Sequence, residues 1–380
     1  MRILLLNHGA AAQWGGGDGV QIAETARQLR LRGHQVEELN SDAPDVAGFD
    51  LVHIFNCRFQ SSFAAQMQAC TRAGIPVVVS PIWLSIARAV WGSRGVHGVL
   101  TKAVREGSKS VVSHLLMMKQ RTLKVNWDES IVHYDGHGYS KAERLAAVGQ
   151  LLTNANALLP NSWLELQAVR TDLFWTGNLF DVAHIGVDPS MFLSPDPNRF
   201  LEYFDLRKSF VLQAGRIEPG KNQAMLCWAL RQTDLQIVLI GSSANWPSYA
   251  QLCREISGDR LTIIDHIPQE MLASAYAAAG VHVLPSWMET CGLVSLEAAC
   301  SGTPVVGSTF GHELEYLQRD AWYCDPADPD SIRTAVISAL QAGRDSDRPL
   351  GLKERVLGQF TWEMLAIRTE RLYQEVLEKI

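Results

Sequence analysis

The feature that most constrains the fold is a regular alternation of short apolar runs with helix-length segments. The chain begins with the run RILLLN, a glycine-rich loop, a segment with Ile22, Ala26 and Leu29 on one face, and the strand-like QVEEL. Further apolar runs lie at 50–55 and 75–82. Such alternation is typical of βαβ units, whose strands form a parallel sheet. The first half is therefore predicted to be an α/β domain.

The alternation begins again after a loop rich in Asp and Pro at 188–197. Strands are expected near 209–214, 235–240, 261–264, 281–285 and 304–307. At 380 residues the chain also exceeds the ~250–300 residues at which a single core usually stops growing. We therefore predict two Rossmann-like domains, at 1–188 and 198–358, that face each other across a central cleft. A helix at 359–380 is expected to cross back to the first domain.

Composition argues against several classes of protein. Hydrophobic residues make up 47% of the chain, and no uncharged apolar run reaches the ~18 residues that a membrane helix needs. The net charge of −6 argues against a nucleic acid partner. The seven cysteines form an odd set without a Cys-x-x-Cys pair, which argues against a disulfide frame or a zinc site. We expect a cytoplasmic protein.

Two cations follow the strand expected at 209–214. Arg216 and Lys221 lie five residues apart in the segment GRIEPGKN, between a strand end and a helix start. Cations and free helix amides at such a place suit a diphosphate. The alternative is a solvated turn.

Two carboxylates flank the start of a second predicted helix, at 293–300. Glu289 lies in the loop before this helix, and Glu297 lies eight residues later, within the helix. Amides at the helix start can bind phosphate oxygens, and the carboxylates can accept hydrogen bonds from sugar hydroxyls. The alternative is a helix with two surface acids. The amides concerned are those of Gly292, Leu293 and Val294.

The two segments together resemble the donor site of glycosyltransferase family 4, whose signature is Glu-x7-Glu. GRIEPGKN and ETCGLVSLE occur in the order of the family, GGGDGVQIAETARQLRLRGHQV resembles its first loop and helix, and IGVDPSMF resembles its interdomain segment. The resemblance covers most of the chain. It implies a GT-B fold and retaining transfer of a hexose-type sugar from a UDP- or GDP-linked donor. The acceptor would be a hydroxyl of a glycan, a lipid-linked molecule or a small molecule.

The family resemblance also implies roles for individual residues. Arg216 and Lys221 would bind the diphosphate, Glu289 the donor sugar and Glu297 the ribose, and the first three are the expected catalytic residues. No metal or other cofactor is expected, because two cations and helix amides can neutralise a leaving diphosphate. The remaining expected donor-site residues are Gly15, Gly16, Gly17, Cys291, Gly292, Leu293 and Val294.

The strand at 75–82 departs from the family pattern. Family members often carry a histidine at its end, where this chain has Ser80 and Pro81. Ser80, Trp83 and His133 are the candidates for the acceptor side. His133, Asp135 and His137 would supply a substitute base or a metal site, and a polar loop is the alternative reading.

Further departures lie around the second carboxylate motif. Thr290 and Cys291 stand where the family has Gly and Phe, and His312 replaces the second Gly of a pair, whereas Glu315 keeps its family position. We predict that Cys291 is a packing residue rather than a nucleophile. Trp14 and Trp287 either stack on the ligand or fill space. The segment Asp328-Pro-Asp330 imitates a metal-binding Asp-x-Asp motif but is interpreted as a helix cap.

A basic segment at 97–124 mixes Lys and Arg with apolar residues. It resembles an amphipathic surface that lies on an anionic membrane or steers a phosphorylated lipid acceptor. The alternative is a solvated insertion, and binding at the inner face of a membrane is the hypothesis to test.

Three other functions compete with sugar transfer. A nucleotide-sugar epimerase would use a similar fold, but Glu-x7-Glu favours transfer. A dinucleotide-dependent oxidoreductase is suggested by the run Gly15-Gly16-Gly17-Asp18-Gly19, which does not have the G-x-G-x-x-G spacing. A non-catalytic nucleotide-sugar-binding protein is the third alternative, since the residues at 80 and 291 depart from the family.

Overall fold

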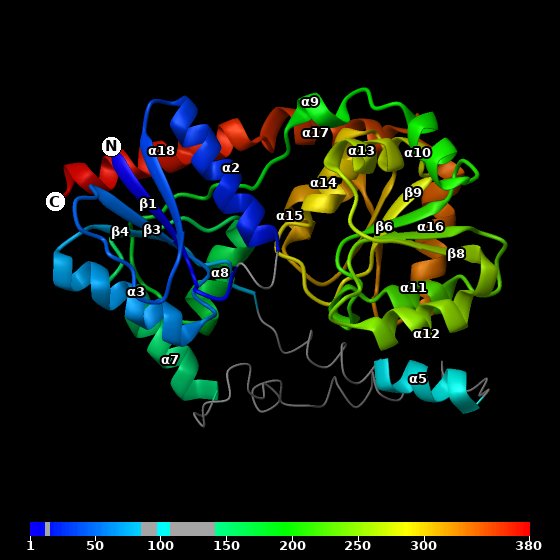
Figure 1. Ribbon diagram of the computed structural model, residues 1–380, viewed down its shortest axis with the longest axis horizontal. Coiled ribbons are helices and arrows are strands. Elements are labelled where there is room, and N and C mark those ends of the chain that lie inside the picture. Colours follow the sequence, from blue (N-terminus) through cyan, green and yellow to red (C-terminus); the bar gives the residue numbers. More distant parts are fainter. Residues whose placement is uncertain (12–15, 85–96, 107–140) are drawn as a thin grey trace. The chain divides into compact units, whose positions relative to one another are not determined.

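The chain forms two compact α/β units (Figure 1). The computed structural model describes residues 1–11, 16–84, 97–106 and 141–380. Each unit has its own sheet and its own core, and each is described by itself. Unit 1 comprises Met1–Ser85, Ile131–Gly186 and Gln359–Ile380, and unit 2 comprises Ile86–Ser130 and Val187–Gly358.

The sheet of unit 1 is parallel throughout, with the strand order β2-β1-β3-β4-β5. All five residues of β3 are buried, which explains why its sequence is apolar except for His53 rather than alternating. The order reverses between β1 and β3, so their carboxyl ends form the switch point at which such sheets bind ligands. The strands are β1 (Arg2–Asn7), β2 (Gln35–Asn40), β3 (Leu51–Phe55), β4 (Val77–Ser80) and β5 (Ala157–Leu158).

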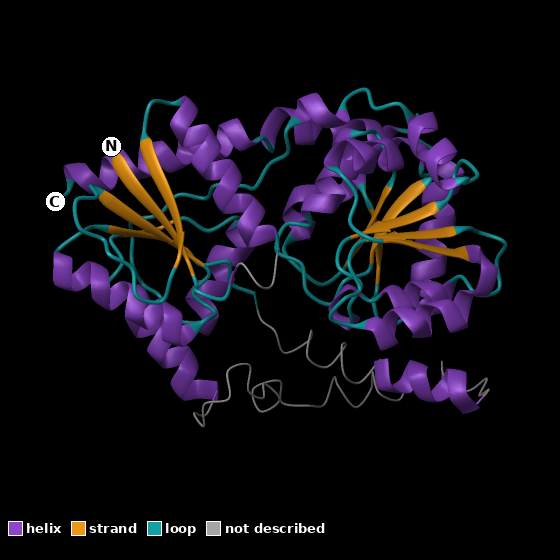
Figure 2. Ribbon diagram, in the orientation of Figure 1, coloured by secondary structure: helices purple, strands orange, loops and turns teal. Residues whose placement is uncertain are grey.

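Helices lie on both faces of this sheet (Figure 2). The C-terminal helix α18 (Trp362–Glu378) belongs to unit 1 and packs against α2 (Gly17–Leu31). The hydroxyl of Tyr373 lies 2.6 Å from Nδ1 of His53, and Glu370 pairs with both Arg32 and His34. These contacts fix the last helix to the first sheet. The other described helices of the unit are α3 (Gln60–Ala73), α7 (Lys141–Leu152) and α8 (Trp163–Asp172).

Unit 2 has a six-stranded parallel sheet with the order β11-β10-β9-β6-β7-β8. The order reverses between β6 and β9, which places the switch point of this unit at their carboxyl ends. The strands are β6 (Val211–Ala214), β7 (Ile237–Ile240), β8 (Leu261–Ile264), β9 (Val281–Leu284), β10 (Val305–Ser308) and β11 (Trp322–Cys324).

The helices of unit 2 alternate with its strands. The described ones are α5 (His97–Glu106), α9 (Pro189–Phe192), α10 (Pro197–Phe204), α11 (Gln223–Ala229), α12 (Pro247–Ser257), α13 (Gln269–Ala278), α14 (Leu293–Cys300), α15 (Glu313–Leu317), α16 (Pro329–Ala342) and α17 (Asp347–Gln359), with the 3-10 turns η2 (Pro219–Lys221), η3 (Gly258–Arg260) and η4 (Gln318–Asp320).

Two parallel-sheet α/β units confirm the predicted fold class, and the predicted strands fall within two residues of the observed ones. Helix α14 has the predicted bounds, and Asp328 caps α16 by accepting hydrogen bonds from the amides of Asp330 and Ser331. The division of the chain differs in one respect, because α5 belongs to unit 2, where Leu100 and Ala103 enter the core beside α11 and α12.

Two predictions from composition can also be compared with the structure. All seven cysteines lie among the described residues, and each is buried as a free thiol. In the described part of the chain, no helix has both the length and the apolar character that crossing a membrane requires. The basic segment lies outside the described residues beyond position 106.

Candidate functional site

The two segments with the family motif meet at the switch point of unit 2. The loop at 215–222 follows β6, and the loop at 285–292 follows β9, the strand that pairs with β6. Parallel strands bring their carboxyl ends to one edge of the sheet, so the two loops are neighbours although 63 residues separate Asn222 from Pro285.

An ion pair joins these loops. Nζ of Lys221 donates to Oε2 of Glu289 at 2.6 Å, and the side chains are only 19% and 11% exposed. Burial lowers the pKa of Lys221, but the attraction and hydrogen bond of Glu289 outweigh it and leave the pKa raised. Lys221 therefore stays charged at neutral pH. The cation expected at the diphosphate and the carboxylate expected at the sugar lie beside each other.

The asparagine next to Lys221 holds the lysine loop in place, a role that the sequence did not indicate. Asn222 has a φ of +64° and is 3% exposed. Its Nδ2 donates to the carbonyl oxygens of Pro285 at 3.0 Å and Pro326 at 2.9 Å. The amide of Trp287 adds a bond of 3.0 Å to the carbonyl oxygen of Gly220. Asn222 thereby fixes the lysine loop to the loop that carries Glu289.

Replacing Asn222 by alanine is expected to lower the free energy of unfolding by about 3 kcal/mol, because two buried carbonyls lose their donor and alanine disfavours positive φ. Urea denaturation measures the change. Asn198→Ala is the matched control, since Asn198 is exposed, and it should cost less than about 0.5 kcal/mol. Equal stability of the two variants would contradict the role of Asn222.

Arg216 lies on the same loop and is more open to solvent. Its guanidinium is 46% exposed and lies 3.2 Å from Glu218. Its carbonyl oxygen accepts a hydrogen bond from Gln223, which fixes the backbone while the side chain faces outward. Arg216 is thus placed to approach an anion without desolvating a buried group.

The start of α14 lies between the two carboxylates of the motif. Gly292 caps the helix with a φ of +68°, and a Cβ at this position would lie 2.7 Å from Oε2 of Glu313. The first amides of a helix have no acceptor in a preceding turn, so those of Leu293 and Val294 can bind an anion. The loop is held by the amide of His312, which donates to the carbonyl oxygen of Glu289 at 2.9 Å.

Glu297 lies on α14 and is 5% exposed. Nε2 of Gln269 donates to its Oε1 at 2.8 Å, and the hydroxyl of Tyr276 donates to its Oε2 at 2.9 Å. Burial raises the pKa of Glu297 to about 7, against the lowering effect of both hydrogen bonds. The carboxyl group therefore changes charge near neutral pH.

Cys291 and Trp287 are packed in the interior of unit 2. Cys291 is 5% exposed, and burial raises the pKa of its thiol, so no reactive thiolate is favoured at neutral pH. Trp287 is 3% exposed and stacks on Phe310 with ring centroids 6.0 Å apart. Both side chains fill space in unit 2, as predicted for Cys291 and as one of the two readings of Trp287.

The residues predicted from the first domain lie in unit 1 or outside the described residues. Gly16 caps α2 and Gly17 is its first residue, so both lie at a helix N-terminus. Trp14, Gly15, His133, Asp135 and His137 lie outside the described residues, and their roles stay predictions.

Ser80 and Trp83 make interior contacts in unit 1. The hydroxyl of Ser80 is 1% exposed, donates to the carbonyl oxygen of Leu159 and lies 2.9 Å from Nε2 of His53. The indole of Trp83 donates to Asp172 at 2.9 Å. A role of either residue at an acceptor stays a prediction.

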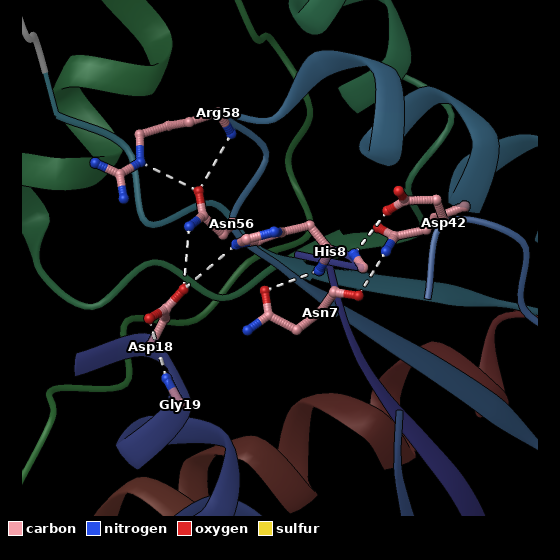
Figure 3. Close-up of polar contacts among 9 residues, drawn as sticks. Asn7, His8, Asp18, Gly19, Asp42, Asn56 and Arg58 are labelled. Carbon is pink, nitrogen blue, oxygen red and sulfur yellow. Dashed lines mark hydrogen bonds and ion pairs between the residues drawn. The ribbon is translucent and has the colours of Figure 1, made fainter. Parts of the chain in front are cut away.

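Unit 1 has a polar cluster of its own at the switch point between β1 and β3, which the sequence did not reveal (Figure 3). His8 follows β1, Asp18 lies in the first turn of α2, and Asn56 and Arg58 follow β3. Nε2 of His8 lies 4.0 Å from Oδ2 of Asp18, and Nδ2 of Asn56 donates to the same oxygen at 3.3 Å. Nε of Arg58 donates to Asn56 at 3.1 Å.

This cluster combines a neutral base with a cation. Burial lowers the pKa of His8, and Asp18 and Asp42 oppose the shift only in part. The imidazole stacks on Phe59 with a centroid distance of 3.7 Å. In the described part of the chain, no residue accepts a hydrogen bond from either Nη group of Arg58. The cluster can therefore bind hydroxyl groups and an anion side by side.

Comparison with known sequences agrees with this arrangement. Residues 208–342 match the family described as Glycosyl transferases group 1. A D-inositol 3-phosphate glycosyltransferase of Mycobacteroides abscessus is 28% identical over 78% of this chain and 70% of that protein. A protein of the same name from Nocardioides sp. is 27% identical over 96% of this chain and 86% of its own length.

Comparison with solved structures shows the fold. Sucrose-phosphate synthase from Thermosynechococcus elongatus matches with a TM-score of 0.75 and 18% identity, over 100% of both chains. Anabaena HepE in complex with UDP-glucose matches with a TM-score of 0.69 and 16% identity, also over 100% of both. The chain is therefore a glycosyltransferase of the GT-B fold, whose second unit carries a glycosyl transferases group 1 domain.

Proposed function

We propose that this glycosyltransferase acts with retention of configuration and transfers a hexose-type sugar from a UDP- or GDP-linked donor to a hydroxyl acceptor in the cytoplasm. The observation that carries the proposal is the Lys221–Glu289 ion pair at the switch point of unit 2, beside the start of α14. A cation, a carboxylate and free helix amides are the three kinds of group that a sugar diphosphate needs.

Each group has a defined task in this proposal. Lys221 and Arg216, with the amides of Leu293 and Val294, stabilise the negative charge that grows on the leaving diphosphate. Glu289 accepts hydrogen bonds from sugar hydroxyls, and Glu297 accepts them from the ribose. Because two cations and two amides face the diphosphate, the proposal requires no metal ion. Solved neighbours bound to UDP-glucose and UDP-2-fluoro glucose support a UDP-linked donor.

Transfer is tested by incubating the protein with UDP-glucose or GDP-mannose and a panel of hydroxyl acceptors. We expect release of UDP or GDP that depends on the acceptor, and a product whose anomeric proton coupling shows the configuration of the donor. A product of opposite configuration would contradict retention. Release of a free epimerised sugar without an acceptor would instead support an epimerase.

The pH dependence of donor binding should follow Glu297. Its carboxylate accepts ribose hydroxyls only when ionised, so affinity should rise by up to about tenfold as pH increases from 6 to 8, through the pKa of about 7. Glu297→Gln should bind the donor weakly and with little dependence on pH. Calorimetric titration at several pH values measures this, and a wild-type affinity that falls over the same range would contradict it.

The same shift has the opposite effect on the stability of the free protein. A carboxyl whose pKa is raised by folding stabilises the fold fully below its unfolded pKa of 4.5 and loses this contribution as pH rises through about 7. Glu165 in unit 1 has a pKa raised to about 7 by burial and acts in the same direction. The protein should therefore lose stability as pH rises through about 7. Glu297→Gln should remove only part of this loss, because Glu165 still contributes to it.

The acceptor is proposed to bind the cluster of His8, Asp18, Asn56 and Arg58 in unit 1. Asp18 and Asn56 can bind hydroxyl groups, and the Nη groups of Arg58 can bind an anion. Relatives are named for inositol 3-phosphate and sucrose phosphate, which supports a small phosphorylated acceptor over a neutral glycan.

Arg58→Met should remove the preference for a phosphorylated acceptor without changing donor affinity. We expect the wild type to bind D-inositol 3-phosphate more tightly than inositol, by about tenfold for a charge-assisted contact. Calorimetry on both compounds measures the preference. Arg72→Met is the matched control, because Arg72 is exposed on α3 and outside the cluster. An unchanged preference in Arg58→Met would contradict the assignment.

A non-catalytic nucleotide-sugar-binding protein is the second candidate, and the burial of Ser80 favours it. Ser80 stands where the family has a histidine, and its hydroxyl is bonded inside unit 1. Donor binding without turnover, on any acceptor of the panel, would support this candidate over the transferase.

An anionic membrane surface is proposed as a further partner of residues 97–124. In the described part of this segment, Leu100 and Ala103 pack in the core of unit 2, while Lys102 is exposed. Binding by this part would therefore depend on charge rather than on insertion of its apolar face. Pelleting with anionic and with neutral liposomes tests the proposal, and equal failure to bind both would end it.

A further inference from the structure

A second buried carboxyl group lies beside the Lys221–Glu289 pair and is explained neither by the family motif nor by the fold. Glu313 is the first residue of the five-residue helix α15 and is fully buried. Its Oε1 accepts a hydrogen bond of 2.8 Å from the amide of Ser308, but its Oε2 has no partner among the described residues. A buried oxygen without a partner costs stability, so a functional reason is needed.

The unpaired oxygen points at the start of α14. A Cβ on Gly292 would lie 2.7 Å from Oε2 of Glu313 and 3.5 Å from Cγ of Glu289. Both carboxyl groups thus lie close to one glycine. Gly311 lets the chain before α15 approach Glu289, since a Cβ there would lie 2.7 Å from the carbonyl oxygen of Glu289. Glycines at both places permit the close approach of the two acidic segments.

The surroundings of Glu313 favour the protonated form of its carboxyl group. Burial raises its pKa well above the usual value, and the negative charge of Glu289 raises it further, against the amide of Ser308 and the charge of Lys221. A neutral carboxyl group is a hydrogen-bond donor as well as an acceptor. Two neighbouring carboxyl groups that cannot both ionise can share one proton.

Binding of the sugar nucleotide changes the partners of the Glu289 carboxylate. In the structure, Glu289 is paired with Lys221 at 2.6 Å. In the proposed function, Lys221 turns to the diphosphate and Glu289 turns to the sugar, so the carboxylate loses the cation that neutralises it while it stays 11% exposed. A partly buried carboxylate whose only partners are neutral sugar hydroxyls is less well stabilised than one paired with a cation. A further hydrogen-bond donor to Glu289 would then compensate for the loss of Lys221.

We propose that Glu313 is a positioning residue, whose neutral carboxyl group donates a hydrogen bond to Glu289 once the donor has engaged Lys221. It does not touch the donor. It holds Glu289 in the orientation that accepts the sugar hydroxyls. The atom of Glu313 that makes this contact is Oε2, which has no partner among the described residues in the free protein. The inference rests on the proposed function, because it assigns Glu289 to the sugar.

Two variants separate this role from a structural one. Glu313→Leu fills a similar volume without a polar atom. It removes the unpaired oxygen but also the acceptor of the Ser308 amide, so its stability should stay close to that of the wild type. Glu313→Gln keeps a neutral donor of the same length. We expect Glu313→Leu to weaken donor affinity roughly tenfold and Glu313→Gln to restore it to within about threefold.

Calorimetry with a sugar nucleotide and with its bare nucleotide identifies the part of the donor concerned. The probes are UDP-glucose with UDP and GDP-mannose with GDP, whichever pair the wild type binds. Because Glu289 is assigned to the sugar, Glu313→Leu should lose affinity for the sugar nucleotide and keep its affinity for the bare nucleotide. Thermal unfolding of each variant gives the stability.

The outcomes distinguish the inference from the proposed function. If the wild type binds none of the four probes, the proposed function fails. If the wild type binds a sugar nucleotide and Glu313→Leu binds it equally well, Glu313 has no positioning role. Equal loss of affinity for sugar nucleotide and bare nucleotide in Glu313→Leu would also overturn the inference, as would failure of Glu313→Gln to restore binding. If Glu313→Leu does not fold, Glu313→Gln alone tests the inference, and weak binding of the sugar nucleotide by Glu313→Gln would contradict it.

Discussion

Lys221→Met is expected to lower kcat/KM by about 100- to 1,000-fold, because it removes the least exposed cation that faces the leaving diphosphate. Nucleotide release at subsaturating donor measures the loss. Methionine has a side chain of similar length, so the change in kcat/KM measures the effect of removing the positive charge. The remaining activity should come from Arg216 and the amides of α14.

The Lys221 variant needs a control for charge alone. Lys208→Met removes the same charge from an exposed position before β6 and should keep wild-type activity. A similar loss in both variants would mean that net charge, rather than the position of Lys221, affects turnover. Wild-type kcat/KM in Lys221→Met would show that the cation has no part in the reaction.

Gly292→Ala is expected to abolish detectable donor binding and to lower the free energy of unfolding by about 2–4 kcal/mol. Its φ of +68° disfavours a side chain, and the new Cβ would lie 2.7 Å from Oε2 of Glu313. Relief of this clash would displace either the start of α14 or the buried carboxyl group of Glu313, which lies close to Glu289, and either shift would disturb the donor site. Calorimetry and urea denaturation measure the two effects.

Gly302→Ala is the matched control for backbone strain. Gly302 has a φ of +72°, but a Cβ there would meet nothing closer than Cδ of Lys353 at 3.9 Å. It should therefore lose about 1–2 kcal/mol of stability and keep its donor affinity. If both variants bind the donor as the wild type does, the close packing at Gly292 has no functional role.

The local pattern of apolar residues predicts most of the strands and helices of the fold. Fully buried parallel strands consist mainly of apolar residues, so the sequence predicts β7 directly and predicts β3 and β9 in spite of one buried histidine in each. The two missed strands, β5 and β11, have two and three residues, which is too short for any period to show. The place of α5 in unit 2 was also missed, because an amphipathic pattern does not say which core its apolar face joins.

The candidate site was predictable where its residues follow strands. Arg216, Lys221, Glu289 and Glu297 were placed correctly on two loops and a helix of one domain. Their mutual contacts were not predictable, since Lys221 and Glu289 are 68 residues apart and Asn222 reaches a carbonyl 104 residues away. Such contacts depend on the order of the strands in the sheet, which cannot be predicted from the local sequence.

The residues that were missed carry no motif. His8 and Arg58 are single polar residues after strands, and only the pairing of β1 with β3 brings them together. Glu313 is an acid near a helix start without a motif, and its carboxyl group is buried against Gly292 and Gly307, where no Cβ occupies the space. In both cases the tertiary packing, rather than the local sequence, creates the chemistry.

Calorimetric titration of the wild-type protein with UDP-glucose and GDP-mannose tests the central claim most directly, with Lys221→Met titrated in parallel. We predict that one donor binds with a stoichiometry of one per chain and that Lys221→Met weakens its affinity by about tenfold or more. Binding of neither donor to the wild type, or equal affinity of the wild type and Lys221→Met, would contradict a nucleotide-sugar site at the switch point of unit 2.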